Sequence, residues 1–285
     1  MSSRFVMKAM IGFYMLIFFL YLFGPLAMMS VSAFNTPNYP TAIPFEGFTL
    51  HWFADLLDDR DMMLGLQNSL IIGAGVVALS VPIGVAASIL MMQIYWRARS
   101  VYYLVAVSPV LTPGVIIGIS TVIFWKDFSG LIGTRFFYDG MILSIFGQTS
   151  FVSAFCMLII MARLQRFDRA QEEAALDLGA SYPQVFWHVL LPFLKPAIFS
   201  ACVIAFLFSF ENYNTTTFAI LADKTLVTVL AGRVRQGTTP ALSALAVLII
   251  ATSLAGAILF ELLRRREEAK AERAKEAARL AEAAN

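Results

Sequence analysis

QNSLIIGAGVVALSVPIGVAASILMM, residues 67–92, contains no charged side chain over 26 consecutive positions. A helix needs about 20 predominantly apolar residues to cross a bilayer, so this run predicts a membrane-spanning helix. Small residues recur along it, among them Gly73, Gly75 and Gly84. Such residues allow neighbouring helices to approach closely, and this favours a packed helical bundle in the membrane.

The rest of the chain has the same character. Of its 285 residues, 59% are hydrophobic and 14% are charged, whereas an average soluble domain is about 45–50% apolar and about 25% charged. Six segments are long and apolar enough to span a bilayer, near residues 9–33, 67–92, 101–124, 141–162, 197–221 and 241–263. Because lipid leaves no partner for free backbone polar groups, we expect helices in all six. The fold class predicted is an all-α integral membrane protein with six transmembrane helices.

The distribution of basic residues predicts the orientation of these helices. With the N-terminus in the cytoplasm, 15 lysines and arginines lie inside and 6 lie outside. This bias favours two cytoplasmic termini. The first apolar run is longer than the h-region of a signal peptide, so we expect the first span to be retained as an anchor. We therefore expect a membrane domain over residues 1–264 and a charged, helical cytoplasmic tail over residues 265–285. Arg264, Arg265 and Arg266 follow the last span and are expected to contact lipid headgroups.

The loop between the fourth and fifth spans, residues 163–195, is too long for a simple connector. RAQEEAALDL (169–178) contains strong helix formers, and Gly179 can end the helix and permit a sharp turn with positive φ. A second helical segment is expected from Pro183. The short helix carries a small apolar face flanked by acids, made of Ala174, Ala175 and Leu178 with Glu172, Glu173 and Asp177. This arrangement is typical of a helix that docks into a partner's groove.

The same loop contains a spaced pattern. It reads Glu173-Ala174-Ala175, three residues, Gly179, nine residues, Val189, one residue, and Leu191-Pro192. This pattern resembles the EAA loop of ATP-binding-cassette (ABC) importer permeases. Three further stretches, FEGFTLHWFADLLDDRDMMLGLQNSL (45–70), Ser108-Pro109 and EEAALDLGAS (172–181), are similar to the C-type permease subunit of spermidine/putrescine importers.

The resemblance implies a type I importer fold in a bacterial inner membrane, crossed several times by the chain. It implies a second permease subunit, as a heterodimer, two copies of an ATPase subunit and a periplasmic substrate-binding protein. The EAA helix would be the coupling helix, seated in a cleft of the ATPase. The residues expected to couple are Glu172, Glu173, Ala174, Ala175, Asp177, Leu178, Gly179 and Ala180.

No phosphate-binding loop of the form GxxxxGK[ST] is present, so we expect ATP and Mg²⁺ at the partner ATPase and no cofactor on this chain. No catalytic or metal-ligating set is predicted. His51 and His188 have no partner at ligand spacing, and Cys156 and Cys202 are typical of buried small hydrophobes. A net charge of +2 with no basic stripe outside the tail gives no indication of nucleic-acid binding.

A polar run, FSFENYNTTTF (208–218), interrupts the fifth apolar segment. On a helix that starts at Ala197, Glu211 lies roughly 21 Å along the axis, within the outer half of the membrane. A charge at the bilayer centre costs about 2.5–3.5 kcal/mol, so this side chain should face a cavity or a partner. We expect the run either to extend the helix or to break it beside a protein-lined cavity. The predicted pathway residues are Glu211, Asn212, Tyr213, Asn214 and Thr215.

Two interpretations of Glu211 remain at this point: a translocation pathway, or an ion pair that holds the bundle together. The leading functional hypothesis is a permease subunit for a small polar, cationic solute such as spermidine or putrescine. Related polyamine permeases carry two adjacent acids where this chain has Glu211-Asn212. An amino-acid derivative, an opine or an organophosphonate is the alternative cargo, and an ion-driven secondary transporter or an intramembrane enzyme is the alternative class.

Overall fold

The computed structural model describes residues 3–256, 258 and 262. The expected tail, the boundary at 264 and the end of the sixth span lie outside these residues. The chain divides into two compact units, one formed by residues 60–233 and one by residues 1–59 with 234–285. We describe each unit by itself.

The described residues contain five helices that are long and apolar enough to cross a membrane, together with a shorter apolar helix, Pro240–Gly256. The long ones are Met7–Ala33, Arg60–Gln93, Gly114–Ile132, Gly140–Leu164 and Tyr182–Phe210. The predicted all-α membrane fold is confirmed. The first and fourth spans agree with the expected bounds within two residues at both ends. The second span agrees at its C-terminal end and begins seven residues earlier than expected, at Arg60.

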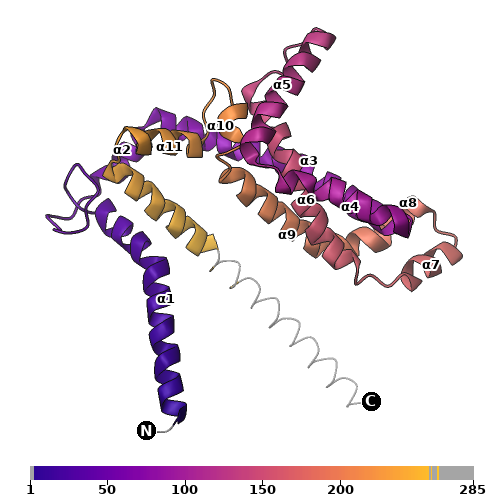
Figure 1. The fold of residues 1–285 in the computed structure, drawn as a ribbon, viewed down its shortest axis with the longest axis horizontal. Coiled ribbons are helices and arrows are strands. Elements are labelled where there is room, and N and C mark those ends of the chain that lie inside the picture. Colours follow the sequence, from indigo (N-terminus) through magenta and orange to yellow (C-terminus); the bar gives the residue numbers. More distant parts are fainter. Residues whose placement is uncertain (1–2, 257, 259–261, 263–285) are drawn as a thin grey trace, which may run out of the picture. The chain divides into compact units, whose positions relative to one another are not determined.

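The unit formed by residues 60–233 is a helical bundle (Figure 1). Its elements are α3 (Arg60–Gln93), α4 (Trp96–Leu111), α5 (Gly114–Ile132), α6 (Gly140–Leu164), α7 (Ala170–Asp177), α8 (Tyr182–Val185), a π-helical turn η1 (Phe186–Leu190), α9 (Leu191–Phe210), α10 (Thr216–Ala219) and α11 (Leu226–Gln236), the last of which continues beyond the unit. Helices α3, α6 and α9 pack against one another and supply most of the hydrophobic core.

Close packing of α3 on α6 depends on a small residue. A Cβ placed on Gly84 would lie 2.5 Å from the Cβ of Cys156 and 2.8 Å from the backbone nitrogen of Met157. Neither atom belongs to a flexible side-chain end, so the two helices would have to separate. The small residues in the second apolar run therefore set the distance between two core helices.

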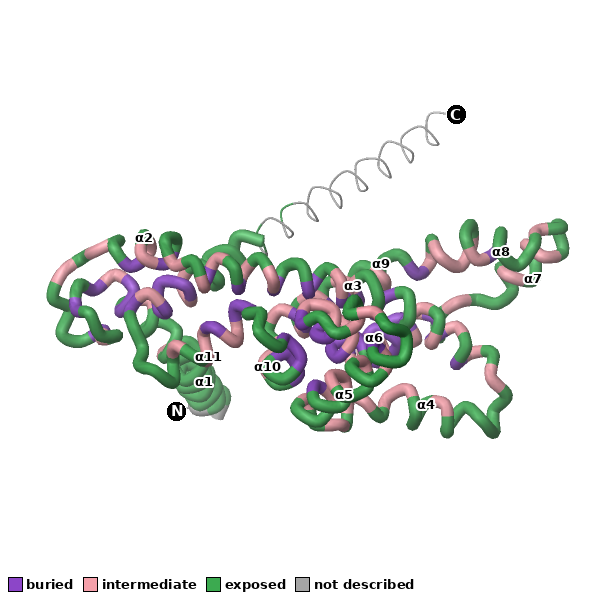
Figure 2. Tube along the Cα trace, turned by 90° about the horizontal axis from the view of Figure 1, so that it is seen from above, coloured by how far each residue is buried: buried purple, intermediate pink, exposed green. Residues whose placement is uncertain are grey.

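Helices α4 and α5 contribute little to this core. No residue of α4 is buried, and only Gly118 and Ser129 are buried on α5. Figure 2 shows the contrast between these helices and the buried positions on α6. Apolar helix surfaces with so few internal contacts are suited to lipid or to another membrane subunit.

The interval expected for the third span, 101–124, is wrong, because it is not one helix. α4 ends at Leu111, Thr112 is extended (φ −86°, ψ 130°), and α5 begins after Pro113. Proline disfavours the helical conformation of the residue before it and lacks an N–H of its own, which explains the break. The membrane-length helix is α5.

The bounds expected for the fifth span, 197–221, are also wrong. One continuous helix runs from Tyr182 to Phe210, and Glu211 follows it as the C-cap residue. Of the two outcomes expected for the polar run, the break is the one observed. The loop of residues 163–195 therefore ends within the same helix that leads to Glu211.

The other unit contains α1 (Ser3–Ala33), α2 (His51–Asp58) and the helix Pro240–Gly256. Buried Asn35 organises the segment between α1 and α2. Its amide nitrogen donates to the carbonyls of Thr41 and Pro44, both at 3.0 Å, and its oxygen accepts from the Glu46 backbone at 2.8 Å. The Trp52 indole donates to the Asn35 carbonyl at 2.7 Å.

We predict that Gly84→Ala lowers the detergent melting temperature, with a cost of about 1–3 kcal/mol typical of overpacking. The matched control is Gly75→Ala on the same helix, whose Cβ would meet the tip of a flexible side chain, Ile145 Cδ1, at 2.6 Å. Rotation of that side chain should relieve the contact. Equal melting temperatures for the two variants would contradict the packing argument.

Candidate functional site

The loop between α6 and α9 is built from local capping interactions. Asp168 Oδ1 accepts from the Ala170 backbone at 3.0 Å at the start of α7. Gly179 has φ +87°, as expected, and lets the Ala180 N–H donate to the Ala175 carbonyl at 3.0 Å. Glycine adopts this left-handed conformation without the strain that a side chain would add. The short helix predicted in the loop is present, and its turn is formed.

The capped helix α7 presents an exposed surface. Glu173, Ala174 and Asp177 are exposed, and the Leu178 side chain is 89% exposed. Glu172, Ala175 and Ala180 are half-buried. Large apolar side chains continue this surface along the following helix, with Tyr182 72% and Trp187 63% exposed. All eight predicted coupling residues thus lie on one short segment, and their role in coupling stays a prediction.

Two arginines connect helices and loop at this end of the bundle. The Arg163 guanidinium lies 4.2 Å from the centroid of the Phe193 ring and donates to the Phe193 carbonyl at 3.3 Å. Arg169, at the start of α7, donates to the Met92 carbonyl at the end of α3 at 3.3 Å. Cations favour the C-terminal ends of helices, where carbonyls lack intrahelical partners. Arg169 therefore connects the loop to α3, whereas Arg163, in the last turn of α6, connects α6 to α9.

The polar run after α9 forms an irregular segment rather than a helix. The side-chain oxygen of Asn212 accepts from the backbone N–H groups of Thr215 and Thr216, both at 3.2 Å. These bonds begin the short helix α10. The Asn212 side chain thus accepts hydrogen bonds from backbone N–H groups that the helix break would otherwise leave unpaired.

A buried hydrogen-bond network ties this segment to α6. Gln148 donates to the Thr216 hydroxyl at 2.8 Å and accepts from the Ser209 hydroxyl. The Thr216 hydroxyl in turn donates to Asn212 at 3.1 Å. Gln148 lies about 12 Å along α6 from Gly140 and about 24 Å from its other end, so the network is at membrane depth.

Gln148 and Ser209 were not among the predicted site residues. The signal was present, since Gln148 is an amide inside the apolar run 141–162. A polar side chain there needs a partner, and in this structure that partner is the broken segment.

A cavity of about 390 Å³ opens where two helix breaks face each other. One break is Thr112-Pro113 between α4 and α5, and the other is the segment after α9. The lining residues include all five predicted pathway residues, and the full set is Pro109, Val110, Thr112, Gly114, Ile117, Phe151, Phe155, Phe208, Glu211, Asn212, Tyr213, Asn214 and Thr215. Non-helical backbone within a membrane is tolerated where it lines such a cavity.

The Glu211 side chain is exposed to this cavity. Within the part of the chain that the structure describes, its carboxylate makes no ion pair and no hydrogen bond. The ion-pair interpretation of Glu211 therefore has no partner among these residues. The geometry favours the pathway interpretation, which stays a prediction.

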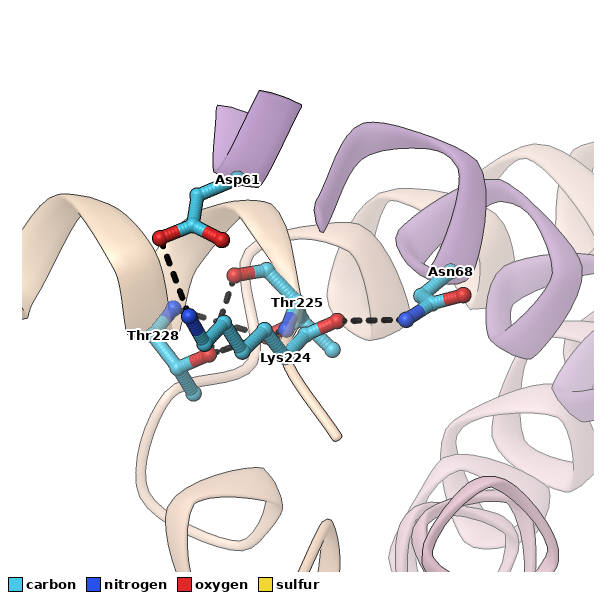
Figure 3. Close-up of polar contacts among 5 residues, drawn as sticks. All are labelled: Asp61, Asn68, Lys224, Thr225 and Thr228. Atoms are coloured by element: carbon cyan, nitrogen blue, oxygen red, sulfur yellow. Dashed lines mark hydrogen bonds and ion pairs between the residues drawn. The ribbon is translucent and has the colours of Figure 1, made fainter. Parts of the chain in front are cut away.

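A second attachment holds the chain beyond α10 (Figure 3). Lys224 forms an ion pair with Asp61 at 2.9 Å, and its carbonyl accepts from Asn68 at 2.8 Å. The Leu226 N–H donates to the Ser69 hydroxyl at 3.0 Å. The segment from Glu211 to Leu226 is thus fixed at one end to α6 and at the other end to α3.

Among the described residues, no group of three or more histidine, cysteine, aspartate or glutamate side chains is placed to hold a metal ion. The polar groups gathered at the cavity are one carboxylate, two amides and hydroxyls. This set can bind and guide a solute.

The family model for binding-protein-dependent transport system inner membrane components matches residues 80–268. The chain belongs to this family. It is a permease subunit of an ABC importer and not an enzyme, as the sequence resemblance implied. Membership of this family also excludes the alternative that the protein is an ion-driven secondary transporter.

Relatives of this family member include polyamine permeases. The putrescine transport system permease protein PotI of Escherichia coli (strain K12) is 30% identical over 257 residues, covering 89% of this chain and 90% of PotI. The spermidine/putrescine transport system permease protein PotC of the same strain is 24% identical over 255 residues, covering 89% of this chain and 93% of PotC.

Solved structures show the same fold. A bacterial ABC transporter involved in the import of the acidic polysaccharide alginate has a chain that matches with a TM-score of 0.67 and 17% identity, covering 90% of this chain and 93% of that one. The alginate transporter in complex with its alginate pentasaccharide-bound periplasmic protein matches with a TM-score of 0.64 and 16% identity, covering 90% and 92%. The ABC importer permease fold is therefore established for this family member.

We predict that Gln148→Leu lowers the detergent melting temperature, because the Ser209 hydroxyl loses its acceptor and the Thr216 hydroxyl loses a donor, at a cost of about 1–3 kcal/mol. It should also reduce uptake, since the segment that carries Glu211 loses its attachment to α6. The matched control is Gln165→Leu, the same change at the exposed C-cap of α6. A Gln148→Leu variant as stable and active as the control would show that the network is dispensable.

Proposed function

We propose that this permease forms half of the translocation pathway for a small polar cation such as spermidine or putrescine. The observation that carries the proposal is the cavity at the two helix breaks, with Glu211 exposed in its wall. A carboxylate at membrane depth attracts a positively charged solute and is costly unless it has such a role. The names of PotI and PotC support this choice of cargo.

The proposed partner for the other half is a second, different permease subunit. Helices α4 and α5 leave apolar surface outside the core of this unit, as a heterodimer interface requires. The cavity is not enclosed by this chain alone, and the second subunit would complete its wall.

Coupling to ATP hydrolysis is proposed to run through the loop of residues 163–195. Two copies of a separate ATPase subunit would bind ATP and Mg²⁺, and one of them would receive α7 in a cleft. The exposure of Leu178 and the acids beside it support docking of this helix. The bond of Arg169 to α3 and the continuation of the loop into the helix Tyr182–Phe210 provide a physical route from the ATPase to the cavity.

The proposed location is the bacterial inner membrane, crossed several times, with both termini in the cytoplasm. The lysine and arginine distribution supports this orientation. A periplasmic substrate-binding protein would deliver the cargo from the opposite side, as the complex solved for the alginate transporter illustrates for that protein. Lipid surrounds the remaining apolar surface.

A different small solute, such as an amino-acid derivative, an opine or an organophosphonate, is the alternative cargo for the same importer type. The test is uptake of radiolabelled putrescine by proteoliposomes that contain the complete importer with its binding protein. ATP-dependent accumulation supports the polyamine assignment, and its absence together with uptake of one of the other solutes contradicts it.

We predict that Glu211→Gln reduces putrescine uptake at least several-fold without reducing the amount of assembled complex. Glutamine keeps the size of the side chain and removes its charge, so the loss would be electrostatic. The matched control is Asp127→Asn on α5, which removes an exposed carboxylate that does not line the cavity. Uptake and detergent melting are measured on the same preparations.

Unchanged uptake by Glu211→Gln would remove this residue from the pathway. Loss of both uptake and thermal stability would instead favour a structural ion pair with a group outside the described residues or on another subunit.

We predict that Glu173→Lys leaves membrane insertion intact and weakens recovery of the ATPase in a pull-down, because it reverses the charge of an exposed acid on α7. The control is Glu46→Lys, the same change at an exposed position between α1 and α2. Equal recovery of the ATPase with both variants, and equal transport, would refute the docking role of this acid.

A further inference from the structure

The cavity at Glu211 has aromatic walls. Phe151 and Phe155 of α6, Phe208 of α9 and Tyr213 line it together with the carboxylate. The rings of Phe155 and Phe208 meet edge to face with centroids 4.6 Å apart. None of the lining residues is a lysine or an arginine.

This combination matches one chemical group. A carboxylate supplies the counter-charge for an ammonium, and aromatic faces attract cations and pack against methylene groups. A solute with a carboxylate or phosphonate would meet Glu211 without a basic side chain to balance its own charge.

A second cavity, of about 360 Å³, adjoins the first and shares Pro109, Thr112 and Ile117 with it. Its polar lining consists of hydroxyls. Four of them donate their proton to a carbonyl of their own helix or of the same turn: Ser108 to Val105, Thr112 to Ser108, Thr121 to Ile117 and Ser150 to Gly147, at 2.7–3.0 Å.

These internal bonds fix the role of four of the five hydroxyls, and the fifth, Ser120, makes no hydrogen bond among the described residues. A hydroxyl has one proton and two lone pairs, so a hydroxyl whose proton is engaged offers only acceptor positions to a ligand. An ammonium group has three donors and no acceptor. The second cavity is therefore suited to an N–H donor.

We propose that the two cavities are subsites for the two amino groups of a linear alkyl diamine. Glu211 and the aromatic walls hold one ammonium, and the hydroxyls of Ser108, Thr112, Thr121 and Ser150 accept from the other. The alkyl chain lies between them, along Pro109 and Ile117. This inference rests on the proposed function and names the chemistry by which the pathway selects its cargo.

The test measures equilibrium binding of radiolabelled putrescine to the purified complex of permease and ATPase subunits in nanodiscs. Competitors are n-butylammonium, 1,4-butanediol and γ-aminobutyrate, which share the chain and differ in charge. We expect n-butylammonium to compete, and the neutral diol and the zwitterion to compete at least tenfold more weakly. Competition by γ-aminobutyrate equal to that of n-butylammonium would overturn the inference.

Matched variants test each subsite. Phe208→Leu should weaken putrescine binding about three- to tenfold, whereas Phe199→Leu, an exposed position on the same helix, should not. Ser150→Ala should weaken putrescine binding about threefold and leave n-butylammonium binding unchanged, because a monoamine uses only the Glu211 subsite. Ser200→Ala removes a hydroxyl that donates to its own helix outside both cavities and is the control.

Uptake by the complete importer separates this inference from the proposed function. Normal ATP-dependent putrescine uptake and binding by Phe208→Leu and Ser150→Ala would overturn the two subsites and leave the permease assignment intact. Failure of the wild-type importer to take up putrescine, or full uptake by Glu211→Gln, would overturn the proposed pathway itself.

Discussion

A helix that breaks inside a membrane must find new partners for its backbone, and this structure depends on how that requirement is met. The side-chain oxygen of Asn212 accepts from the backbone N–H groups of Thr215 and Thr216, at the start of the short helix α10. Gln148 then connects that segment to α6 through Thr216. Without these bonds the break would expose unpaired amide groups to an apolar medium. With them, the chain can leave polar side chains facing a cavity at membrane depth.

Helix α6 both supports the broken segment and lines the space in front of it. Gln148, Phe151 and Phe155 follow at i, i+3 and i+7 and therefore lie on one face of the helix. The first binds the segment, and the other two line the cavity. A core helix that packs tightly on α3 and α9 is a rigid base for such a wall. The packing of α6 in the core thus determines where the cavity lies.

The sequence predicted the membrane class, the helical loop with its glycine turn and the five residues at the cavity, because each is encoded locally. Composition and apolar run length report the membrane environment directly. Gly179 stops a helix by its own conformational freedom. The division of the third span into α4 and α5 and the early start of the helix leading to Phe210 were not predicted, because a proline weakens a helix locally and does not determine where the helix on either side begins or ends. The pairing of Gln148 with Thr216 joins residues 68 positions apart, and no local pattern contains that contact.

The continuous helix from Tyr182 to Phe210 has a mechanical consequence. Its 29 residues, five of them in the π-helical turn η1, span about 43 Å, with the loop that carries α7 at one end and Glu211 directly after the other. A tilt of about 10° pivoting at the loop end displaces the far end by about 7 Å. A small angular change at the loop would therefore become a displacement of several ångströms beside the cavity.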